Sequence, residues 1–411
     1  MTRRALGATA LAALTLAALP RPARAAIGPE RPGPYMLGAD ISWIPEDEAA
    51  GAEFYVDGQR QDIFSILTGA GFNWVRLRLF VNPENGYSAG KKNSPWCGLE
   101  QTIALARRVK AAGMKIALTF HYSDTWADPQ HQEKPAAWAN LSFPDLVKAV
   151  ETHTRDSLSA MKAASVAPDM VHIGNEITFG MLWPEGRVAL PVPTGNPATD
   201  AVHLKPEGIG GYDNLATLLK AGIGAARAVV PDASIMLHNH LGRHWVIVRE
   251  WTDALLARGV AFDLVGFSCY QQLAEGDWER SFQEFTARYP QLGFCAVEYS
   301  GRKQYINDLV FNAPGKRGWG SFIWEPTRHQ EAIFDLDGKN AGGGAKPNLL
   351  SQGINAAEAP GAVQPGTAPP PPPAGPPKHG KGGRYEANSF LDLYRDLARR
   401  YGLAVPAEAG R

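Results

Sequence analysis

Short apolar segments that alternate with helical segments constrain the fold of this chain more than any other feature. Eight of them lie between residues 35 and 335, each with the length and apolar content of a buried strand. They are Met36–Ile41, Trp74–Leu79, Lys115–Phe120, Met170–Gly174, Ser234–Leu237, Leu264–Phe267, Phe294–Val297 and Ser321–Trp324. The predicted helices between them are Leu99–Ala112, Phe143–Ala164, Gly211–Val230, His244–Arg258 and Trp278–Arg288. This alternation predicts an α/β fold, the (β/α)8 TIM barrel.

Two of the predicted strands are followed closely by a glutamate. Asn175 and Glu176 follow the fourth strand, and Glu298 follows the seventh. Reactive groups of a TIM barrel lie at the C-terminal ends of its strands. A retaining glycosidase needs two carboxyl groups about 5–5.5 Å apart, one as acid/base and one as nucleophile. We therefore expect Glu176 to be the acid/base, with a pKa raised by burial and by the charge of Glu298, which is the expected nucleophile.

Other side chains at strand ends are expected to bind substrate. His121, Asp124 and Trp126 lie in the stretch FHYSDTWADPQHQ after the third strand, which mixes aromatic rings with hydrogen-bonding groups. Asn175 is expected to hold a sugar 2-hydroxyl. Tyr270, just past the sixth strand, is expected to hydrogen-bond the nucleophile, and the alternative is a core tyrosine bonded to the backbone.

Two arginines share one face of the second predicted strand. Arg76 and Arg78 alternate with Val75, Leu77 and Leu79. Because guanidinium groups are unfavourable against apolar helices, both are expected to point into the upper barrel. Arg78 lies nearer the strand end and is expected to keep the nucleophile ionised. A structural ion pair is the alternative for both arginines, and it has more weight for Arg76.

Composition and cysteine spacing exclude several classes of function. The formal net charge is zero, so nothing indicates a nucleic-acid partner or an anionic membrane surface. One histidine and two aspartates after the third strand lack the spacing of a metal site. Cys97, Cys269 and Cys295 form no CxxC motif, so we predict neither a metal nor a cofactor. Two buried thiols are favoured over a Cys269–Cys295 bridge.

Both ends of the chain differ in character from the barrel. Residues 1–25 combine a basic start, an apolar run and an A-x-A site, as an export signal does, which predicts a secreted or periplasmic protein without a membrane span. The glycoside hydrolase barrel is expected over residues 26–340, followed by a Gly/Pro-rich insertion or linker over 341–384. A C-terminal helix over 385–403 is expected to close the barrel rather than stand alone. We expect a monomer.

Several segments resemble glycoside hydrolase family 53, whose members are endo-β-1,4-galactanases that cleave type I arabinogalactan. The similar segments lie between about residues 36 and 338. They read GADIS (38–42), FYVDGQRQDIFSIL (54–67), VRLRLFVNP (75–83), FHYSDTWADPQHQ (120–132), IGNE (173–176), LWPEGR (182–187), WEP (324–326) and FDLDG (334–338). The resemblance implies a clan A barrel that retains configuration. It also implies a sugar platform at Trp324, and we include Asp40 and Trp183 among the substrate-binding residues.

Positions at the predicted rim depart from that family. Thr119 stands where Asp is usual, and His238–Trp245 replaces a loop of Asp-Asn-Gly type. Strand six ends in FSCYQQ where a Tyr-Pro pair is usual, and strand seven continues EYS instead of ET. These departures keep open a retaining clan A hydrolase of another β-linked polysaccharide. A non-catalytic carbohydrate-binding barrel is the alternative of another class. No run of Asp and Asn ligands follows strand seven, so no structural calcium is predicted.

Overall fold

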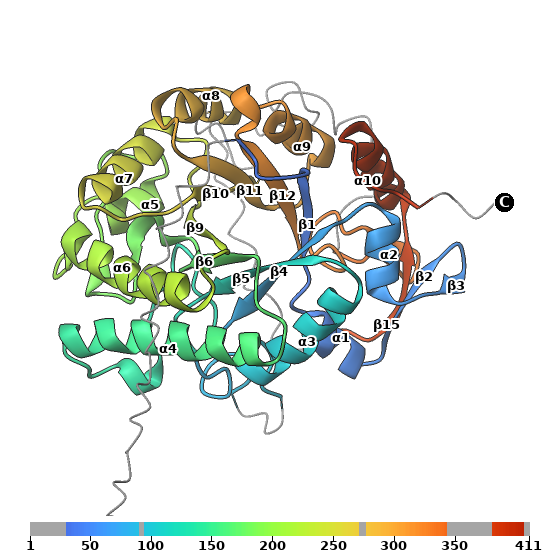
Figure 1. Cartoon of the computed structure of the whole chain (residues 1–411), viewed down its shortest axis with the longest axis horizontal. Coiled ribbons are helices and arrows are strands. Elements are labelled where there is room, and N and C mark those ends of the chain that lie inside the picture. The colour runs from blue at the N-terminus through green and yellow to red at the C-terminus, as the bar shows by residue number, and fades with distance from the viewer. Residues whose placement is uncertain (1–29, 90–93, 271–276, 343–379, 407–411) are drawn as a thin grey trace, which may run out of the picture.

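Eight parallel strands close into a barrel with helices around it (Figure 1). The structure is a computed structural model that describes residues 30–89, 94–270, 277–342 and 380–406. The barrel strands are β1 (Met36–Asp40), β4 (Trp74–Leu79), β5 (Lys115–Phe120), β6 (Met170–Ile173), β9 (Ser234–Asn239), β10 (Leu264–Ser268), β11 (Gly293–Tyr299) and β12 (Gly318–Trp324). Each pairs with the next barrel strand in sequence, and β12 pairs with β1. The predicted (β/α)8 architecture is confirmed.

Helices on the outside of the barrel complete the alternation. The five predicted ones are present, with each end within one residue of its expected place: α3 (Leu99–Ala111), α4 (Phe143–Ala163), α6 (Gly211–Val229), α7 (Trp245–Ala257) and α8 (Trp278–Arg288). The sequence prediction missed α1 (Ile44–Ala49), α2 (Ile63–Gly69), α5 (Pro197–His203) and α9 (Lys303–Phe311). These helices have only six to nine residues, too few for a helical period to stand out.

The inside of the barrel has an apolar lower layer and a polar upper one. The lower layer is one buried cluster of Met36, Trp74, Ala117, Met170, Met236, Leu264, Cys295, Val297, Trp319 and Phe322. Since strand side chains alternate between faces, the next inward positions lie two residues later. On β4, β6 and β9 these positions hold Arg76, His172 and His238, all buried. The apolar layer therefore forms the floor beneath a polar site.

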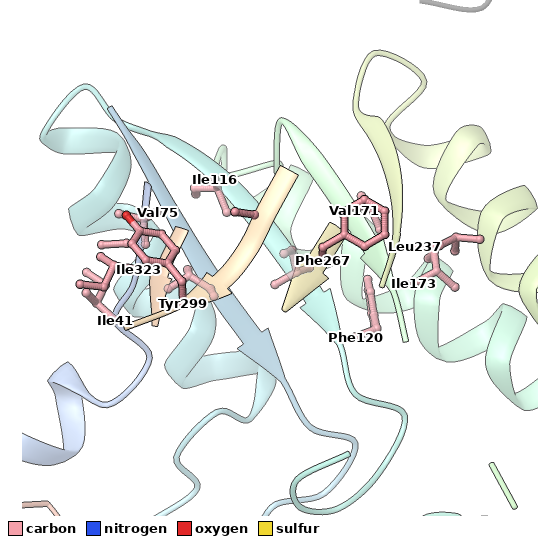
Figure 2. Packing of buried hydrophobic residues seen from close by; sticks show 14 of the residues in the cluster. Ile41, Val75, Ile116, Phe120, Val171, Ile173, Leu237, Phe267, Tyr299 and Ile323 are labelled. Carbon is pink, nitrogen blue, oxygen red and sulfur yellow. The ribbon is translucent and has the colours of Figure 1, made fainter. Parts of the chain in front are cut away.

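The outward faces of the same strands pack against the helices. Val75, Val171, Leu237 and Phe267 are fully buried in the main hydrophobic core (Figure 2). The ring of Phe267 lies 5.4 Å from that of Phe282 on α8. This packing holds each strand in a fixed rotation, which directs the alternate side chains into the barrel.

The C-terminal segment begins with a strand, which corrects the predicted helix over 385–403. Strand β15 (Gly383–Ala387) runs parallel to β2 (Ala52–Val56) and antiparallel to β13 (Phe334–Leu336). β3 (Gln59–Arg60) and β14 (Lys339–Asn340) complete a five-stranded sheet. Buried Tyr385 lies with its ring 5.3 Å from that of Phe54. A strand of five residues directly before a helix carries too little alternation to be separated from it by pattern.

Helix α10 (Ser389–Arg400) follows that strand and lies between α9 and α2 (Figure 1). The hydroxyl of Tyr394 lies 2.9 Å from that of Tyr299 on β11, and its ring lies 4.7 Å from Phe72. The helix is thus tied to the barrel wall. The predicted export signal and residues 343–379 of the predicted insertion lie outside the described residues.

The three cysteines are free thiols, all of them buried. Cys295 belongs to the cluster inside the barrel, whereas Cys269 belongs to the core outside it. The favoured prediction of two buried thiols is therefore confirmed, and the bridge between them is not formed.

Candidate active site

Glu176 lies in a left-handed turn directly after β6. Its φ is 48°, and that of Gly174 is 78°. Glycine adopts such angles without strain, and a Cβ at Gly174 would lie 2.6 Å from the Ile177 side chain. The turn leaves the Glu176 side chain buried, with 9% of its surface exposed.

Glu298 is directed inward by an irregularity in β11. The pairing registers of β11 with β10 and with β12 both shift between Ala296 and the end of the strand. Val297 belongs to the apolar layer inside the barrel, and the next residue, Glu298, has its carboxylate within the same barrel. Two consecutive inward side chains are what a β-bulge permits, and bulges often re-aim side chains beside active sites.

The two glutamates lie close enough to act on one glycosidic bond. One ligand atom from each of Glu176, His238 and Glu298 lies within 4.8 Å of the other two. One carboxyl oxygen of Glu176 and one of Glu298 therefore lie no more than 4.8 Å apart. Retaining glycosidases have carboxyl groups about 5–5.5 Å apart, against about 6.5–9.5 Å in inverting enzymes. The short distance between these oxygens fits the closer, retaining arrangement better than the inverting one.

Arg76 connects Glu298 to two other strands and to the turn after β6. Its Nη1 donates to Glu298 Oε1 at 2.6 Å and to Asp40 Oδ2 at 3.1 Å. Nη2 donates to Asn175 Oδ1 at 2.6 Å, and Nε donates to Thr119 Oγ1 at 2.9 Å. A single buried guanidinium thus fixes side chains from β1, β5, β11 and the turn after β6.

The expected pairing of Arg78 with the nucleophile is wrong. Arg78 Nη1 donates to Asp40 Oδ1 at 3.1 Å, and Nη2 donates to the buried carboxylate of Glu325. Strand parity placed both arginines inside the barrel correctly. It does not say which carboxylate each one meets, because that depends on the register of β1 against β4 on one side and against β12 on the other.

Burial and mutual charge set the protonation of the pair. The pKa of Glu176 lies well above its ordinary range because the carboxyl group is buried and because Glu298 adds a like charge. Burial also raises the pKa of Glu298, but the guanidinium of Arg76 and the hydroxyl of Tyr270 oppose that rise. Tyr270 donates to Glu298 Oε2 at 3.2 Å, as expected from the sequence. These effects favour protonation of Glu176 over protonation of Glu298.

Two partners of Glu176 were not identified as site residues from the sequence. Ser268 donates to Glu176 Oε1 at 2.6 Å, and His238 Nε2 lies 2.9 Å from Ser268 Oγ. Both side chains are buried at the ends of β10 and β9. A neutral serine or histidine at a strand end has no spacing signal of its own. Inward parity was the available clue, since His238 lies two residues after Met236 of the apolar layer.

Aromatic rings stand beside the carboxylates. Trp324, at the end of β12, lies 5.9 Å from the ring of Trp126, 5.1 Å from Trp43 and 4.3 Å from His329. The guanidinium of Arg78 covers the face of Trp126 at 4.3 Å. Trp324 and Trp126 are only partly buried, so each keeps ring surface at the barrel mouth.

His121 and Asp124 hold the loop that carries Trp126. His121 Nδ1 accepts the amide of Ala127 at 3.0 Å, and burial lowers the pKa of this histidine well below its ordinary value. The carboxylate of Asp124 accepts the amides of Asn82 and Ala136, each at 2.9 Å. Both residues were expected to bind substrate. The structure places them in the rim, with these polar atoms bonded to backbone.

Trp183 belongs to a different group of ring contacts from Trp324. Its ring lies 5.7 Å from His203 and beneath the guanidinium of Arg187 at 4.4 Å. Its amide donates to the carbonyl of Gln132. The side chain of Gln132 in turn donates to the carbonyl of Asn175 at 2.8 Å. Trp183 is therefore linked through Gln132 to the turn that carries Glu176.

Within the described part of the chain, Glu176, His238 and Glu298 are the grouping whose ligand atoms could converge on a metal ion. Their hydrogen bonds fit another role. Arg76 supplies positive charge to Glu298, and both ring nitrogens of His238 lie against the backbone amide of Glu176 and the hydroxyl of Ser268. The arrangement suits one ionised and one protonated carboxyl group rather than a set of metal ligands.

Comparisons with known proteins agree with this geometry. A family model described as Glycosyl hydrolase family 53 matches residues 36–292. An arabinogalactan endo-beta-1,4-galactanase from Humicola insolens is 32% identical over 326 residues, which cover 70% of this chain and 88% of the relative. An endo-beta-1,4-galactanase from Bacillus subtilis is 36% identical over 321 residues, covering 71% of this chain and 70% of the relative.

Solved structures give the same assignment. A GH53 catalytic domain from Ignisphaera aggregans superposes with a TM-score of 0.63 at 26% identity, over 79% of this chain and 97% of that one. A structure from a study of two fungal beta-1,4-galactanases gives a TM-score of 0.62 at 26% identity, over 76% and 97%. The chain belongs to glycosyl hydrolase family 53.

Proposed function

We propose that this protein is a retaining endo-β-1,4-galactanase that hydrolyses the galactan backbone of type I arabinogalactan. The observation that carries the proposal is the approach of the Glu176 and Glu298 carboxyl oxygens to within 4.8 Å. Relatives named as galactanases, at 32% and 36% identity, support this substrate. A non-catalytic barrel is disfavoured because both carboxyl groups are present and arranged as a pair.

Each glutamate has a defined task in the two-step displacement. In the first step Glu176 gives its proton to the glycosidic oxygen while a Glu298 oxygen bonds the anomeric carbon and the carbon–oxygen bond breaks. In the second step Glu176, now ionised, takes a proton from water, and the water oxygen replaces Glu298 on the sugar. Arg76 and Tyr270 hold the nucleophile in place between the steps.

Asn175 and Trp324 are the proposed contacts at the cleaved sugar. The amide oxygen of Asn175 accepts from Arg76, and its nitrogen donates to the carbonyl of Ala127 at 2.7 Å. An amide nitrogen has two hydrogens, so one remains for a sugar hydroxyl. Trp324 provides the stacking surface, and Trp126 extends it. Asp40 and Arg78 act through the ion-pair network beneath these groups.

A second candidate substrate is another β-linked polysaccharide. Thr119 supports keeping this alternative, because its hydroxyl directly contacts Arg76 at the centre of the site. We also propose that the protein acts outside the cytoplasm as a monomer. The described residues contain no helix that is long and apolar enough to cross a membrane.

Product analysis tests the proposal. Purified wild type and Glu176→Ala are incubated with linear β-1,4-galactan, and the products are separated by chain length. Short galacto-oligosaccharides from wild type alone support the function and the acid/base together. A folded wild type that leaves galactan intact but cleaves another polysaccharide from a β-linked panel establishes the second candidate. No cleavage of any member contradicts hydrolysis.

A further inference from the structure

We propose that Ser268 and His238 form a positioning pair that leaves the transferable proton of Glu176 on Oε2 and not on Oε1. The proposal rests on the acid/base role given to Glu176 above. It adds two residues to the reaction, and neither of them touches the reacting atoms.

The contacts form a closed ring around the acid/base. The amide nitrogen of Glu176 lies 3.2 Å from His238 Nδ1. On the other side of the imidazole, Nε2 lies 2.9 Å from Ser268 Oγ, and that hydroxyl lies 2.6 Å from Glu176 Oε1. His238 thus contacts the main chain of Glu176, and Ser268 contacts its side chain. We call this chain of hydrogen bonds through His238 and Ser268 the relay.

The direction of each hydrogen bond follows from the buried amide. A buried N–H needs an acceptor, and Nδ1 of His238 supplies it, so this nitrogen carries no proton. Burial lowers the pKa of His238 well below its ordinary value, which leaves a single ring proton, on Nε2. Nε2–H therefore donates a hydrogen bond to the oxygen of Ser268. The serine hydroxyl, in turn, donates a hydrogen bond to Oε1 of Glu176. With Oε1 accepting, the carboxyl proton resides on Oε2.

The opposite tautomer fits the surroundings less well. A proton on Nδ1 of His238 would point to Asn175 Oδ1, 3.2 Å away. That oxygen already accepts from Arg76 at 2.6 Å, and the amide of Glu176 would lose its acceptor. Ser268 would then donate to His238, and Glu176 could bond the serine only by giving up the proton that the leaving group needs.

The relay also assists the proton transfer itself. When the Oε2 proton moves to the glycosidic oxygen, Glu176 becomes a carboxylate. The bond from Ser268 to Oε1 then becomes charge-assisted and stronger. A contact that strengthens along the reaction favours the transition state over the bound substrate. For the same reason, this bond lowers the pKa of Glu176 from the value that burial alone would impose.

Leaving-group dependence is the property that separates this role from a purely structural one. Two aryl glycosides are made with one glycone, a short β-1,4-galacto-oligosaccharide or, if galactan is not the substrate, the β-linked oligosaccharide that wild type does cleave. One carries 2,4-dinitrophenol, which departs without a proton, and the other carries phenol, which needs one. The value of kcat/KM reports the first step for wild type, Glu176→Ala, Ser268→Ala and Ser268→Thr.

The proposal predicts that kcat/KM of Ser268→Ala for the phenyl substrate falls roughly tenfold to a hundredfold. This is the range expected for the loss of one hydrogen bond to a charged group. With the dinitrophenyl substrate, kcat/KM of Ser268→Ala stays within about threefold of the wild-type value, because that leaving group needs no general acid. Ser268→Thr keeps the hydroxyl and restores most of the phenyl activity. The basic limb of the pH profile for the phenyl substrate moves to higher pH in Ser268→Ala. His238→Ala shows the same selectivity.

Ser281→Ala is the matched control, because Ser281 is also a buried serine and lies on α8 outside the barrel. It is expected to match wild type with both substrates. The relay is overturned if Ser268→Ala loses kcat/KM equally with both substrates, or loses it with neither. In that case the acid/base assignment survives as long as Glu176→Ala still shows the leaving-group dependence. If Glu176→Ala itself shows no such dependence, the proposed acid/base is wrong and the relay is overturned with it.

Discussion

Arg76 Nη1 lies 2.6 Å from Glu298 Oε1, and the same guanidinium reaches Asn175, the neighbour of the acid/base, at 2.6 Å. The two halves of the proposed reaction are therefore joined by one buried side chain. The nucleophile gains a counter-charge, and the turn that carries Glu176 gains an anchor. This relationship explains how two carboxyl groups so close together can hold different protonation states.

Replacement of Arg76 tests that relationship. Arg76→Ala leaves Asp40 and Glu298 buried without this counter-charge, so we expect a loss of about 3–5 kcal/mol in the free energy of unfolding. Arg76→Lys keeps the charge but loses the fork that bonds four partners, so it should lose activity with a smaller loss of stability. Denaturant unfolding and kcat/KM measure the two effects. An Arg76→Ala protein with wild-type activity would contradict this role.

Azide distinguishes the two glutamates by stereochemistry. In Glu298→Ala the small anion fits where the nucleophile was and attacks an activated β-glycoside directly, so the expected product is an α-glycosyl azide. In Glu176→Ala the covalent intermediate still forms, and azide attacks it from the opposite face to give a β-glycosyl azide. Proton NMR of the products decides between them. Products of exchanged configuration would show that the two roles are reversed.

Tyr270→Phe tests the electrostatics of the nucleophile. The hydroxyl bond of Tyr270 lowers the pKa of Glu298, so its removal should raise that pKa. Glu298 must be ionised to attack, so the acidic limb of the kcat/KM profile should move to higher pH while the basic limb stays in place. The profile is measured with an aryl glycoside. A shift confined to the basic limb would indicate that Tyr270 acts on Glu176 instead.

The raised pKa of Glu176 also predicts how stability depends on pH. A carboxyl group whose folded pKa exceeds its unfolded value, about 4.3, stabilises the fold fully below that value. The contribution is lost as pH rises through the folded pKa. Glu176→Gln keeps the shape without the titration, so wild type should fall below it in stability as pH rises from about 4 to neutrality. Unfolding free energies over this range measure the gap, with exposed Glu207→Gln as the control. Parallel curves for wild type and Glu176→Gln would contradict the raised pKa.

The sequence predicted the barrel and placed Glu176 and Glu298, the two glutamates proposed as catalytic, at strand ends because each signal was local. Apolar runs of strand length end at Asn175-Glu176 and at Glu298, and their order along the chain determines their places around the barrel. The bulge that aims Glu298 inward was not predictable, since Val297 and Glu298 are neighbours and regular alternation would send only one of them inward.

Contacts that depend on strand register could not be read from the chain. The pairing of β1 with β4 places Asp40 beside Arg76, and Asp40 also reaches Arg78. Both arginines were expected inside the barrel, but only the register decides that Arg76 meets the nucleophile. His238 and Ser268 were missed for the same reason, because they become partners of Glu176 only when β6, β9 and β10 lie side by side.

The anomeric configuration of the first product tests the central claim most directly. Linear β-1,4-galactan is cleaved inside the NMR tube, and the new reducing end is observed before mutarotation. The account predicts that the β-anomer appears first and the α-anomer accumulates later, as two displacements at one carbon require. Initial release of the α-anomer would show a single displacement and would contradict a nucleophilic role for Glu298.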